Sequence, residues 1–272
     1  MVQCSRALLS AAVAEAVYEP RNGRFLATEL SRGPWDPGAQ HAGAPAALLM
    51  RAFERCDGAD ELPVARVTYE FLRPVPLGEL TVQASVSRRG RRVQMLEGAI
   101  LNTDGVEVVR ARALRVAAAD AGGLTTPEPA LPAGPEHGHT HDPTPPHGLP
   151  MFAPAAIEVR FVAGSFGNGP ATAWFRLRVP LIAGEQPSPL QRLAAAGDFG
   201  NGISAVLSWD DYLFINPDLT LYIDRRPVGE WICLQSQMTL APGGIATAES
   251  VMFDERGRVG RATQALLVAR HG

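Results

Sequence analysis

Apolar and polar residues alternate along most of this chain, and two apolar blocks interrupt the alternation. The first block, Gly43–Arg55, is rich in Ala and Leu. The second begins at about Pro189, directly after Ser188, a residue type that caps helices well and is often followed by proline. Alternation with a period of two predicts strands, whereas longer apolar runs predict buried helices. The pattern therefore predicts an α+β protein with one helix in each half.

Alternating segments surround both predicted helices. In the first half they are a hairpin over Arg21–Leu30 and strands over Ala65–Phe71, Glu79–Arg88, Gln94–Asn102 and Val106–Ala117. In the second half they are strands over Ile157–Val162, Ala171–Val179, Leu219–Asp224, Glu230–Thr239, Gly244–Phe253 and Val259–Arg270. A helix this apolar must be covered on most sides. We therefore expect two tandem copies of a curved antiparallel sheet, each wrapped around its central helix.

The two halves repeat one pattern at a separation of 152 residues. The matched pairs are Thr68 with Thr220, Arg73 with Arg225, Gly105 with Gly257 and Val116 with Val268. A unit of this length is too long for a solenoid repeat, so it indicates one small domain that was duplicated and fused. The predicted domains are residues 1–117 and 151–272.

Residues 118–150 are rich in Pro, Gly and Ala and predict a solvated linker between the two domains. The segment contains His137, His139, His141 and His147. Closely spaced imidazoles can bind a transition metal, but a strong site also needs fixed geometry and supporting hydrogen bonds. We therefore expect neither a metal nor a cofactor.

Composition narrows the class of protein. A hydrophobic content of 46% with 19% charged residues is typical of a soluble globular protein. A net charge of −3 gives no electrostatic footprint for nucleic acid. The basic cluster Arg88–Arg92 is either a solvated hairpin tip or a contact for an anionic ligand. No apolar run approaches the roughly 20 residues that span a bilayer, so we expect no membrane partner.

The cysteines point to a reducing compartment. Cys4, Cys56 and Cys233 are odd in number and lack metal-ligand spacing, and nothing at the N-terminus resembles a signal peptide. We therefore expect a cytoplasmic protein. Cys233 lies in an alternating run and is predicted to be a buried small hydrophobe.

At this stage the residues carry a resemblance. A sheet wrapped around a helix, present twice, resembles the double hot-dog fold of the acyl-CoA thioesterase II family. The similarity runs from about residue 20 to the C-terminus and skips the linker. It rests on Gln40-His41-Ala42-Gly43, Ala196-Gly197-Asp198, Asn216-Pro217-Asp218-Leu219-Thr220, Arg225-Arg226-Pro227, Glu230-Trp231 and Thr263-Gln264.

The resemblance implies a site that hydrolyses an acyl thioester such as acyl-CoA to a free acid and a thiol. In the family, an Asp on the second helix, a hydroxyl residue near the next strand and a Gln on the final strand hold the attacking water. These roles fall on Asp198, Asn216 and Gln264. Asn216 departs from the pattern, because an amide replaces the hydroxyl. An amide can still hold a water through its oxygen or its NH2 group.

Four further residues are candidates for substrate binding. His41 and Gly43 belong to the motif before the first helix, and Gly197 and Phe199 flank Asp198. Glycine lets a ligand approach the backbone closely, and helix starts can supply N–H donors for a developing oxyanion. The aromatic residues that either line an acyl pocket or fill the core are Trp35, Phe53, Phe199 and Trp209.

The duplication supports the site independently of the family. At the same separation, the residues matched to Asp198, Asn216 and Gln264 are Ala46, Val64 and Arg112. The second half thus holds three polar groups where the first holds two apolar residues and a cation. An Asp in an apolar helix is costly to bury unless it is paired.

Alternative designs are less well supported. Gly-x-Ser-x-Gly is absent, so a serine elbow is not indicated. The related hydratases use an Asp and a His a few residues apart, and no His is near Asp198 in the sequence. A noncatalytic acyl-CoA or acyl-carrier binding protein of the same fold remains open.

Exposed sheet edges favour a homo-oligomer, most simply a dimer. The sequence leaves open the length of the acyl chain and whether its carrier is coenzyme A or an acyl-carrier protein.

Overall fold

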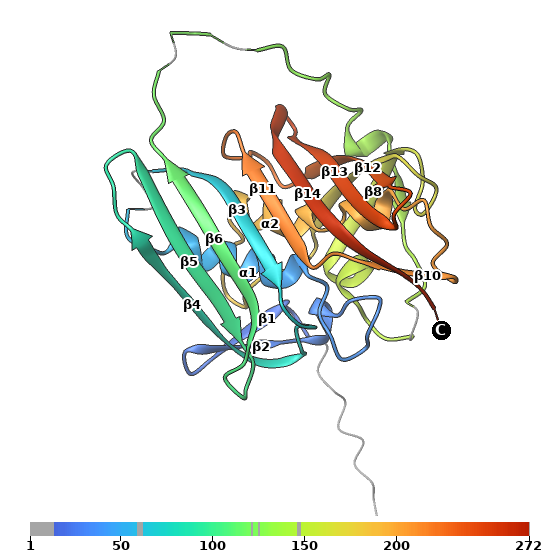
Figure 1. Cartoon of the computed structure of the whole chain (residues 1–272), viewed down its shortest axis with the longest axis horizontal. Helices are drawn as coiled ribbons and strands as arrows, with labels where there is room; N and C mark the ends of the chain where they lie inside the picture. Colours follow the sequence, from blue (N-terminus) through green and yellow to red (C-terminus); the bar gives the residue numbers. More distant parts are fainter. Residues whose placement is uncertain (1–13, 59–61, 121, 125, 146–147, 272) are drawn as a thin grey trace, which may run out of the picture.

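One antiparallel sheet runs through the whole computed structural model (Figure 1). The structure describes residues 14–58, 62–120, 122–124, 126–145 and 148–271, so Cys4 and His147 lie outside the described residues. The strands follow one another across the sheet in the order β1 (Tyr18–Arg21), β2 (Arg24–Ala27), β4 (Gly78–Arg88), β5 (Val93–Leu101), β6 (Glu107–Val116), β3 (Val64–Phe71), β11 (Asp218–Ile223), β14 (Gly257–Arg270), β13 (Ile245–Asp254), β12 (Ile232–Leu240), β9 (Ala171–Leu177), β8 (Ile157–Ala163) and β7 (His139–His141). An additional strand, β10 (Tyr212–Ile215), pairs with β14.

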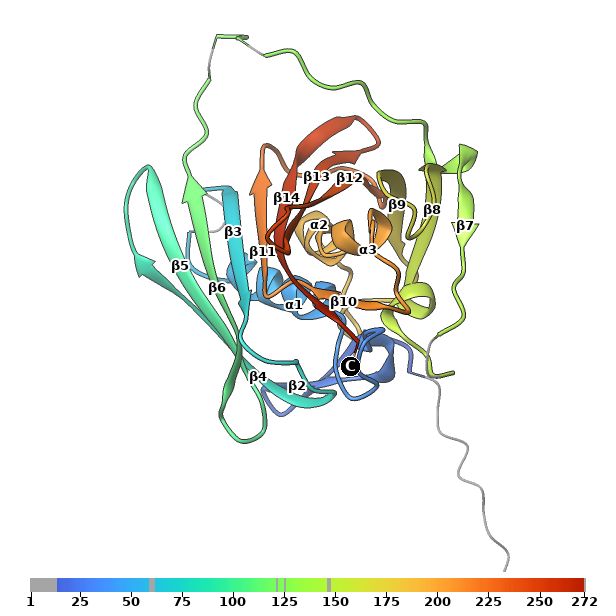
Figure 2. The same ribbon diagram turned by 45° about the vertical axis from the view of Figure 1, so that its right-hand side comes forward.

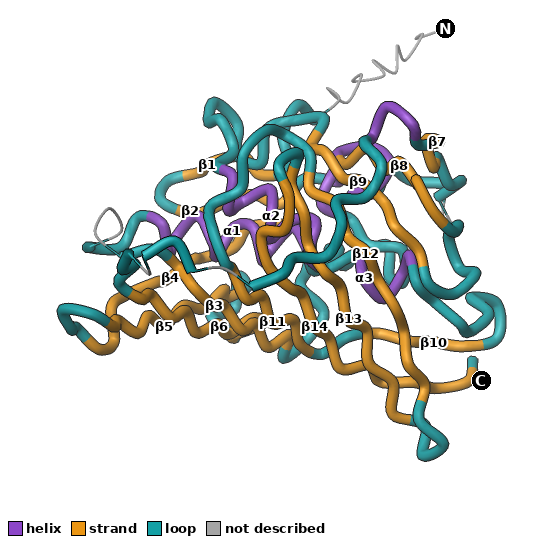
Figure 3. Tube along the Cα trace, turned by 90° about the horizontal axis from the view of Figure 1, so that it is seen from above, coloured by secondary structure: helices purple, strands orange, loops and turns teal. Residues whose placement is uncertain are grey.

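The helices lie on one side of this sheet (Figure 3). The α-helices are α1 (Gly43–Glu54), α2 (Pro189–Gly197) and the short α3 (Gly200–Ile203). The 3-10 helices Glu29–Ser31 and Pro135–His137, and a π-helical turn, Phe152–Ala156, lie in the connections. Helix α1 packs on β4, β5 and β6, whereas α2 packs on β9, β11 and β12. A Cβ atom added to Gly98 would lie 2.9 Å from the Phe53 ring, so this glycine lets α1 approach the sheet closely. Phe53 is thus a fully buried core residue.

The two halves of the sheet join where β3 pairs with β11. Thr68 lies opposite Thr220, and their Oγ1 atoms are 3.2 Å apart. Glu70 and Asp218 are paired two residues to one side, and Arg66 and Tyr222 two residues to the other. This symmetric register places an approximate two-fold axis between the threonines. The separation of 152 residues therefore holds in the central strands.

The matching of Gln264 with Arg112 is wrong by one residue. Thr68 faces Arg112 across β3 and β6, whereas Thr220 faces Thr263 across β11 and β14. The counterpart of Gln264 is therefore Ala113. Five residues separate the paired Leu101 and Glu107, whereas four separate the matching pair, Phe253 and Arg258. A one-residue slip exchanges the two faces of a strand. Accordingly, Arg112 points outward and Ala113 is buried.

The two main helices do not start 152 residues apart, since α1 begins at residue 43 and α2 at residue 189. The match of Ala46 with Asp198 therefore stays a prediction. Other expectations agree with the structure: the apolar blocks are helices, and Cys233 is buried, which raises the pKa of its thiol. The Arg88–Arg92 cluster lies between β4 and β5, as expected for a hairpin tip.

The predicted linker contains more structure than its composition indicated. Its residues His139–His141 form β7, which pairs with β8 at the edge of the sheet (Figure 2). The indole nitrogen of Trp174 donates to the carbonyl of Ala133, at 2.7 Å. His141 stacks on Phe166, and His137 lies 3.3 Å from Glu136. In the described ranges, no helix has the length and apolar character that crossing a bilayer requires.

Arg115 forms hydrogen bonds at the end of α1, and its substitution tests the fold. This fully buried side chain donates to the carbonyl oxygens of Phe53, Cys56 and Asp57, at 2.5, 3.3 and 2.7 Å. Phe53 lies in the last turn of α1, and Cys56 and Asp57 follow the helix, so Arg115 ties the end of α1 to the residues after it. We expect Arg115→Met to lower the free energy of unfolding by about 2–4 kcal/mol in urea denaturation. Arg112→Met, on the outer face of the same strand, should change it by less than about 0.5 kcal/mol. Equal effects of the two substitutions would contradict the assigned role.

Candidate functional site

The end of α2 places Asp198 in the interior of the protein. Ser188 caps the helix start through a bond from the backbone N–H of Gln191, and the helix ends at Gly197. A Cβ atom on Gly197 would lie 2.7 Å from Leu221, so glycine lets the helix end press against β11. The next residue, Asp198, is only 4% exposed. A carboxylate this buried requires hydrogen-bond partners.

Two amide side chains supply those partners. Asn216, which lies just before β11, donates from Nδ2 to Asp198 Oδ1 at 2.7 Å. Gln264, on the inner face of β14, donates from Nε2 to the same oxygen at 3.1 Å and to the Asp198 carbonyl at 3.2 Å. The three polar residues named from the sequence thus meet at one point. Both amides contact the carboxylate itself.

A histidine from the first half completes the cluster. His41 Nδ1 lies 3.1 Å from Asp198 Oδ2, and its side chain is 15% exposed. Its ring stacks on Phe199 with centroids 4.3 Å apart and lies 5.4 Å from the ring of Phe152. His41 thus contacts the Oδ2 atom of Asp198 and stacks on Phe199, whereas the two amides bind the Oδ1 atom.

The backbone N–H of Gly43 competes for the same imidazole nitrogen. It lies 3.1 Å from His41 Nδ1, at the first residue of α1. One ring nitrogen cannot donate and accept at the same time. An ionised carboxylate can only accept, so Nδ1 must carry its hydrogen when it is bonded to Asp198. In that state the Gly43 N–H has no acceptor in the imidazole.

The other aromatic candidates are divided between this site and a neighbouring cluster. Trp35 stacks on Trp209 at 4.5 Å, and both lie against Phe214. Phe199 instead lies 4.8 Å from the Phe175 ring and directly beside His41. Of the four aromatic residues named from the sequence, Phe199 is the one that this stacking joins to the polar cluster.

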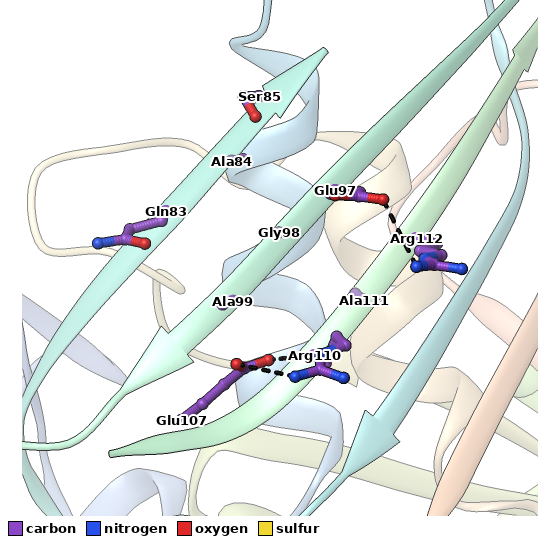
Figure 4. A pocket seen from close by; sticks show the side chains of 10 residues that line it. All are labelled: Gln83, Ala84, Ser85, Glu97, Gly98, Ala99, Glu107, Arg110, Ala111 and Arg112. Atoms are coloured by element: carbon purple, nitrogen blue, oxygen red, sulfur yellow. Dashed lines mark hydrogen bonds and ion pairs between the residues drawn. The ribbon is translucent and has the colours of Figure 1, made fainter. Parts of the chain in front are cut away.

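A separate open hollow of about 460 Å³ lies on the outer face of β4, β5 and β6 (Figure 4). Its charged side chains pair with one another: Arg112 lies 3.6 Å from Glu97, and Arg110 lies 2.8 Å from Glu107. None of the residues around Asp198 lines this hollow. The hollow therefore does not belong to the polar cluster, which lies on the inner face.

Comparison with protein families identifies both halves. Residues 31–116 match the acyl-CoA thioesterase N-terminal domain, and residues 128–268 match the acyl-CoA thioesterase C-terminal domain. The chain belongs to the acyl-CoA thioesterase family. The resemblance inferred from the sequence motifs is thereby confirmed. No curated protein matches the chain by sequence.

Solved structures share the fold of this family member at low sequence identity. A protein of unknown function with a hot-dog fold from Alicyclobacillus acidocaldarius is 16% identical, with a TM-score of 0.72 over 95% of this chain and 97% of that one. A protein from Thermobifida fusca assigned as a thioesterase II is 20% identical, with a TM-score of 0.69 over 94% and 96%. An acyl-CoA thioesterase II from Mycobacterium marinum is 15% identical, with a TM-score of 0.64 over 93% and 94%. The α+β class with a hot-dog sheet is therefore established.

The sequence analysis of this thioesterase family member named His41 for substrate binding but did not predict its contact with Asp198. It searched for a histidine close to Asp198 in the sequence, whereas His41 reaches the carboxylate from the other half. The sequence analysis did not name Asn201, which contacts both Gln264 and Asn216. The available signal was a polar residue three positions after the Asp, in a segment predicted to continue the buried helix.

Gly43 offers a test of how closely the two halves meet at this site. A Cβ atom there would lie 2.5 Å from the carbonyl oxygen of Ala195 in α2. We expect Gly43→Ala to push the helices apart and to lower the free energy of unfolding by about 1–3 kcal/mol, measured by urea denaturation. Gly243→Ala is the matched control, because a Cβ atom there meets no other atom within 4 Å. An unchanged stability of Gly43→Ala would show that the helices are less tightly fitted.

Proposed function

We propose that this protein hydrolyses an acyl thioester, acyl-CoA in the first instance, to a free acid and a thiol. The observation that carries the proposal is the set of contacts on the buried Asp198 carboxylate. Two amides bind its Oδ1 atom, and its Oδ2 atom is directed toward His41. Family membership supports the same reaction class.

In the proposed mechanism, Asp198 is the proton acceptor. Its Oδ2 atom takes a proton from a water molecule, and the resulting hydroxide attacks the carbonyl carbon of the thioester. The tetrahedral intermediate then breaks its C–S bond, and the departing thiolate takes the proton back from Asp198. Asn216 and Gln264 hold Oδ1, so they orient the carboxylate and thereby the water. This role differs from direct binding of the water, which the family pattern implied.

The oxyanion of the tetrahedral intermediate requires a hydrogen-bond donor. We assign this role to the backbone N–H of Gly43, which is freed when His41 donates to Asp198. It lies at the N-terminus of α1, where the helix dipole favours negative charge. His41 and Phe199 would line the reacting end of the substrate, and Gly197 would keep Asp198 close to β11.

The architecture we propose for this activity is a double hot-dog. Residues 1–117 and 151–272 would each form a sheet wrapped around its own helix, with residues 118–150 as the connection. Contacts of α1 with β4, β5 and β6, and of α2 with β9, β11 and β12, support this division. Because His41 and Asp198 come from different halves, the active site would need both.

Replacing the carboxylate by an amide tests the mechanism. We expect Asp198→Asn to lower kcat by about 10²- to 10⁴-fold, because the amide cannot accept the proton. Release of free thiol from acyl-CoAs of increasing chain length measures the rate and also defines the substrate. Asp210→Asn, at an exposed carboxylate, should leave the rate unchanged.

The same assay separates hydrolysis from the alternative function, a noncatalytic acyl-CoA or acyl-carrier binding protein. Titration calorimetry measures binding independently of turnover. If the wild-type protein and Asp198→Asn both bind acyl-CoA but release thiol no faster than buffer, the hydrolase proposal is wrong and the binding protein remains.

A cytoplasmic homo-oligomer, with no nucleic acid or membrane partner, is the setting we propose for this enzyme. The outer strands β1 and β7 end the sheet, and sheet edges favour pairing between protomers. Light scattering should give a multiple of the chain mass of 29.0 kDa. A single species at the monomer mass would contradict the oligomer and leave the proposed reaction untouched.

A further inference from the structure

Asn201 contacts both amides that hold the Asp198 carboxylate. Its backbone N–H donates to Gln264 Oε1 at 3.1 Å, and its side-chain Nδ2 donates to Asn216 Oδ1 at 3.4 Å. The residue is 8% exposed and lies in α3, directly after the site. We infer that Asn201 is a positioning residue that keeps the NH2 ends of Asn216 and Gln264 turned toward Asp198. This inference rests on the proposed hydrolase function.

An amide in this position needs to be oriented because its two ends have similar shape and opposite hydrogen-bonding character. The Nδ2 atom of Asn216 donates to Asp198 Oδ1 and also to the carbonyl oxygen of Asp218, at 3.0 Å. A flip of this amide would place its oxygen against two oxygens that can only accept. The carboxylate would then lose a donor and face a repulsive neighbour.

A relay of donors fixes the direction of the Asn216 amide. The backbone N–H of Gly202 donates to Asn201 Oδ1 at 2.7 Å, which turns the Nδ2 atom of Asn201 toward Asn216. Asn216 in turn presents its own Nδ2 atom to Asp198. A backbone N–H can only donate, and an ionised carboxylate can only accept. Both ends of the relay therefore impose the same direction on the two amides between them.

A second, shorter relay fixes Gln264. The backbone N–H of Asn201 binds its Oε1 atom, so its Nε2 atom points to Asp198. This contact requires the start of α3 to lie close to the sheet. A Cβ atom on Gly200 would lie 2.6 Å from Ser250 Oγ and 3.1 Å from Gln264 Oε1, so glycine makes the approach possible. The two relays end on the same carboxylate oxygen.

The consequence for catalysis is the orientation of the carboxylate. With Oδ1 held by two donors, Oδ2 is fixed on the side of His41, where we place the water. Loss of the Asn201 side chain would let the Asn216 amide turn and would loosen the carboxylate. Because Asn201 contacts neither water nor substrate in this scheme, the loss should appear in kcat and leave KM little changed.

Kinetics of Asn201→Ala in two backgrounds test this role. In the wild-type background we expect kcat to fall about 5- to 30-fold, as the loss of one or two hydrogen bonds predicts. Asn168→Ala is the matched control, because Asn168 is an exposed loop residue whose amide contacts Ser165 and Phe166. That variant should retain the wild-type kcat.

The second background is Asn216→Thr, whose hydroxyl can rotate to donate in any direction and needs no neighbour to orient it. There, adding Asn201→Ala should lower kcat by about twofold or less, which is the non-additivity expected of residues that act through one another. Equal falls in both backgrounds, or an unchanged kcat in the single variant, would overturn the inference.

An NMR measurement makes the test independent of turnover. In the wild-type protein, the side-chain N–H signals of Asn216 should be two distinct resonances that exchange slowly with water. In Asn201→Ala they should broaden and exchange faster. Unchanged signals would overturn the inference. If the signals change but no acyl thioester is hydrolysed, the proposed function fails while the orienting contact stands.

Discussion

The pairing of β3 with β11 is the interaction on which the rest of the structure depends. Thr68 and Thr220 face each other at its centre, and the register on either side joins two half-sheets into one. This junction sets the positions of α1 and α2, whose close approach at Gly43 leaves no room for a methyl group. Only because the halves meet in this register does His41 lie beside Asp198. A shift in this pairing would separate the two.

Much of the fold could be predicted from the sequence, because its strongest signals are local. The long strands and both main helices follow from period two and from apolar runs. The short elements β7, β10 and α3 were not predicted, since three or four residues carry too little periodicity to distinguish a strand from a loop. The mistaken match of Gln264 with Arg112 arose because the connection between the two strands is one residue shorter in the second half.

The candidate site was predictable to the extent that its residues have distinctive chemistry. Asp198, Asn216 and Gln264 are polar residues in apolar surroundings, and the structure brings them together. The partnership of Asp198 with His41 could not be predicted from sequence proximity, because their contact depends on how two distant helices pack. The role proposed for Asn201 depends on the directions of its hydrogen bonds, which only atomic positions reveal.

The corrected register shows which residues of the first half correspond to the two amides of the site. In the first half, the positions equivalent to Asn216 and Gln264 are held by the apolar residues Val64 and Ala113, both buried. A symmetric pair of identical subunits would carry two equivalent clusters, and each subunit would have to supply every group. In the part of this chain that the structure describes, the cluster of one carboxylate and two amides lies in the second half. Hydrocarbon side chains at the two equivalent positions of the first half leave no amide there to orient a second carboxylate.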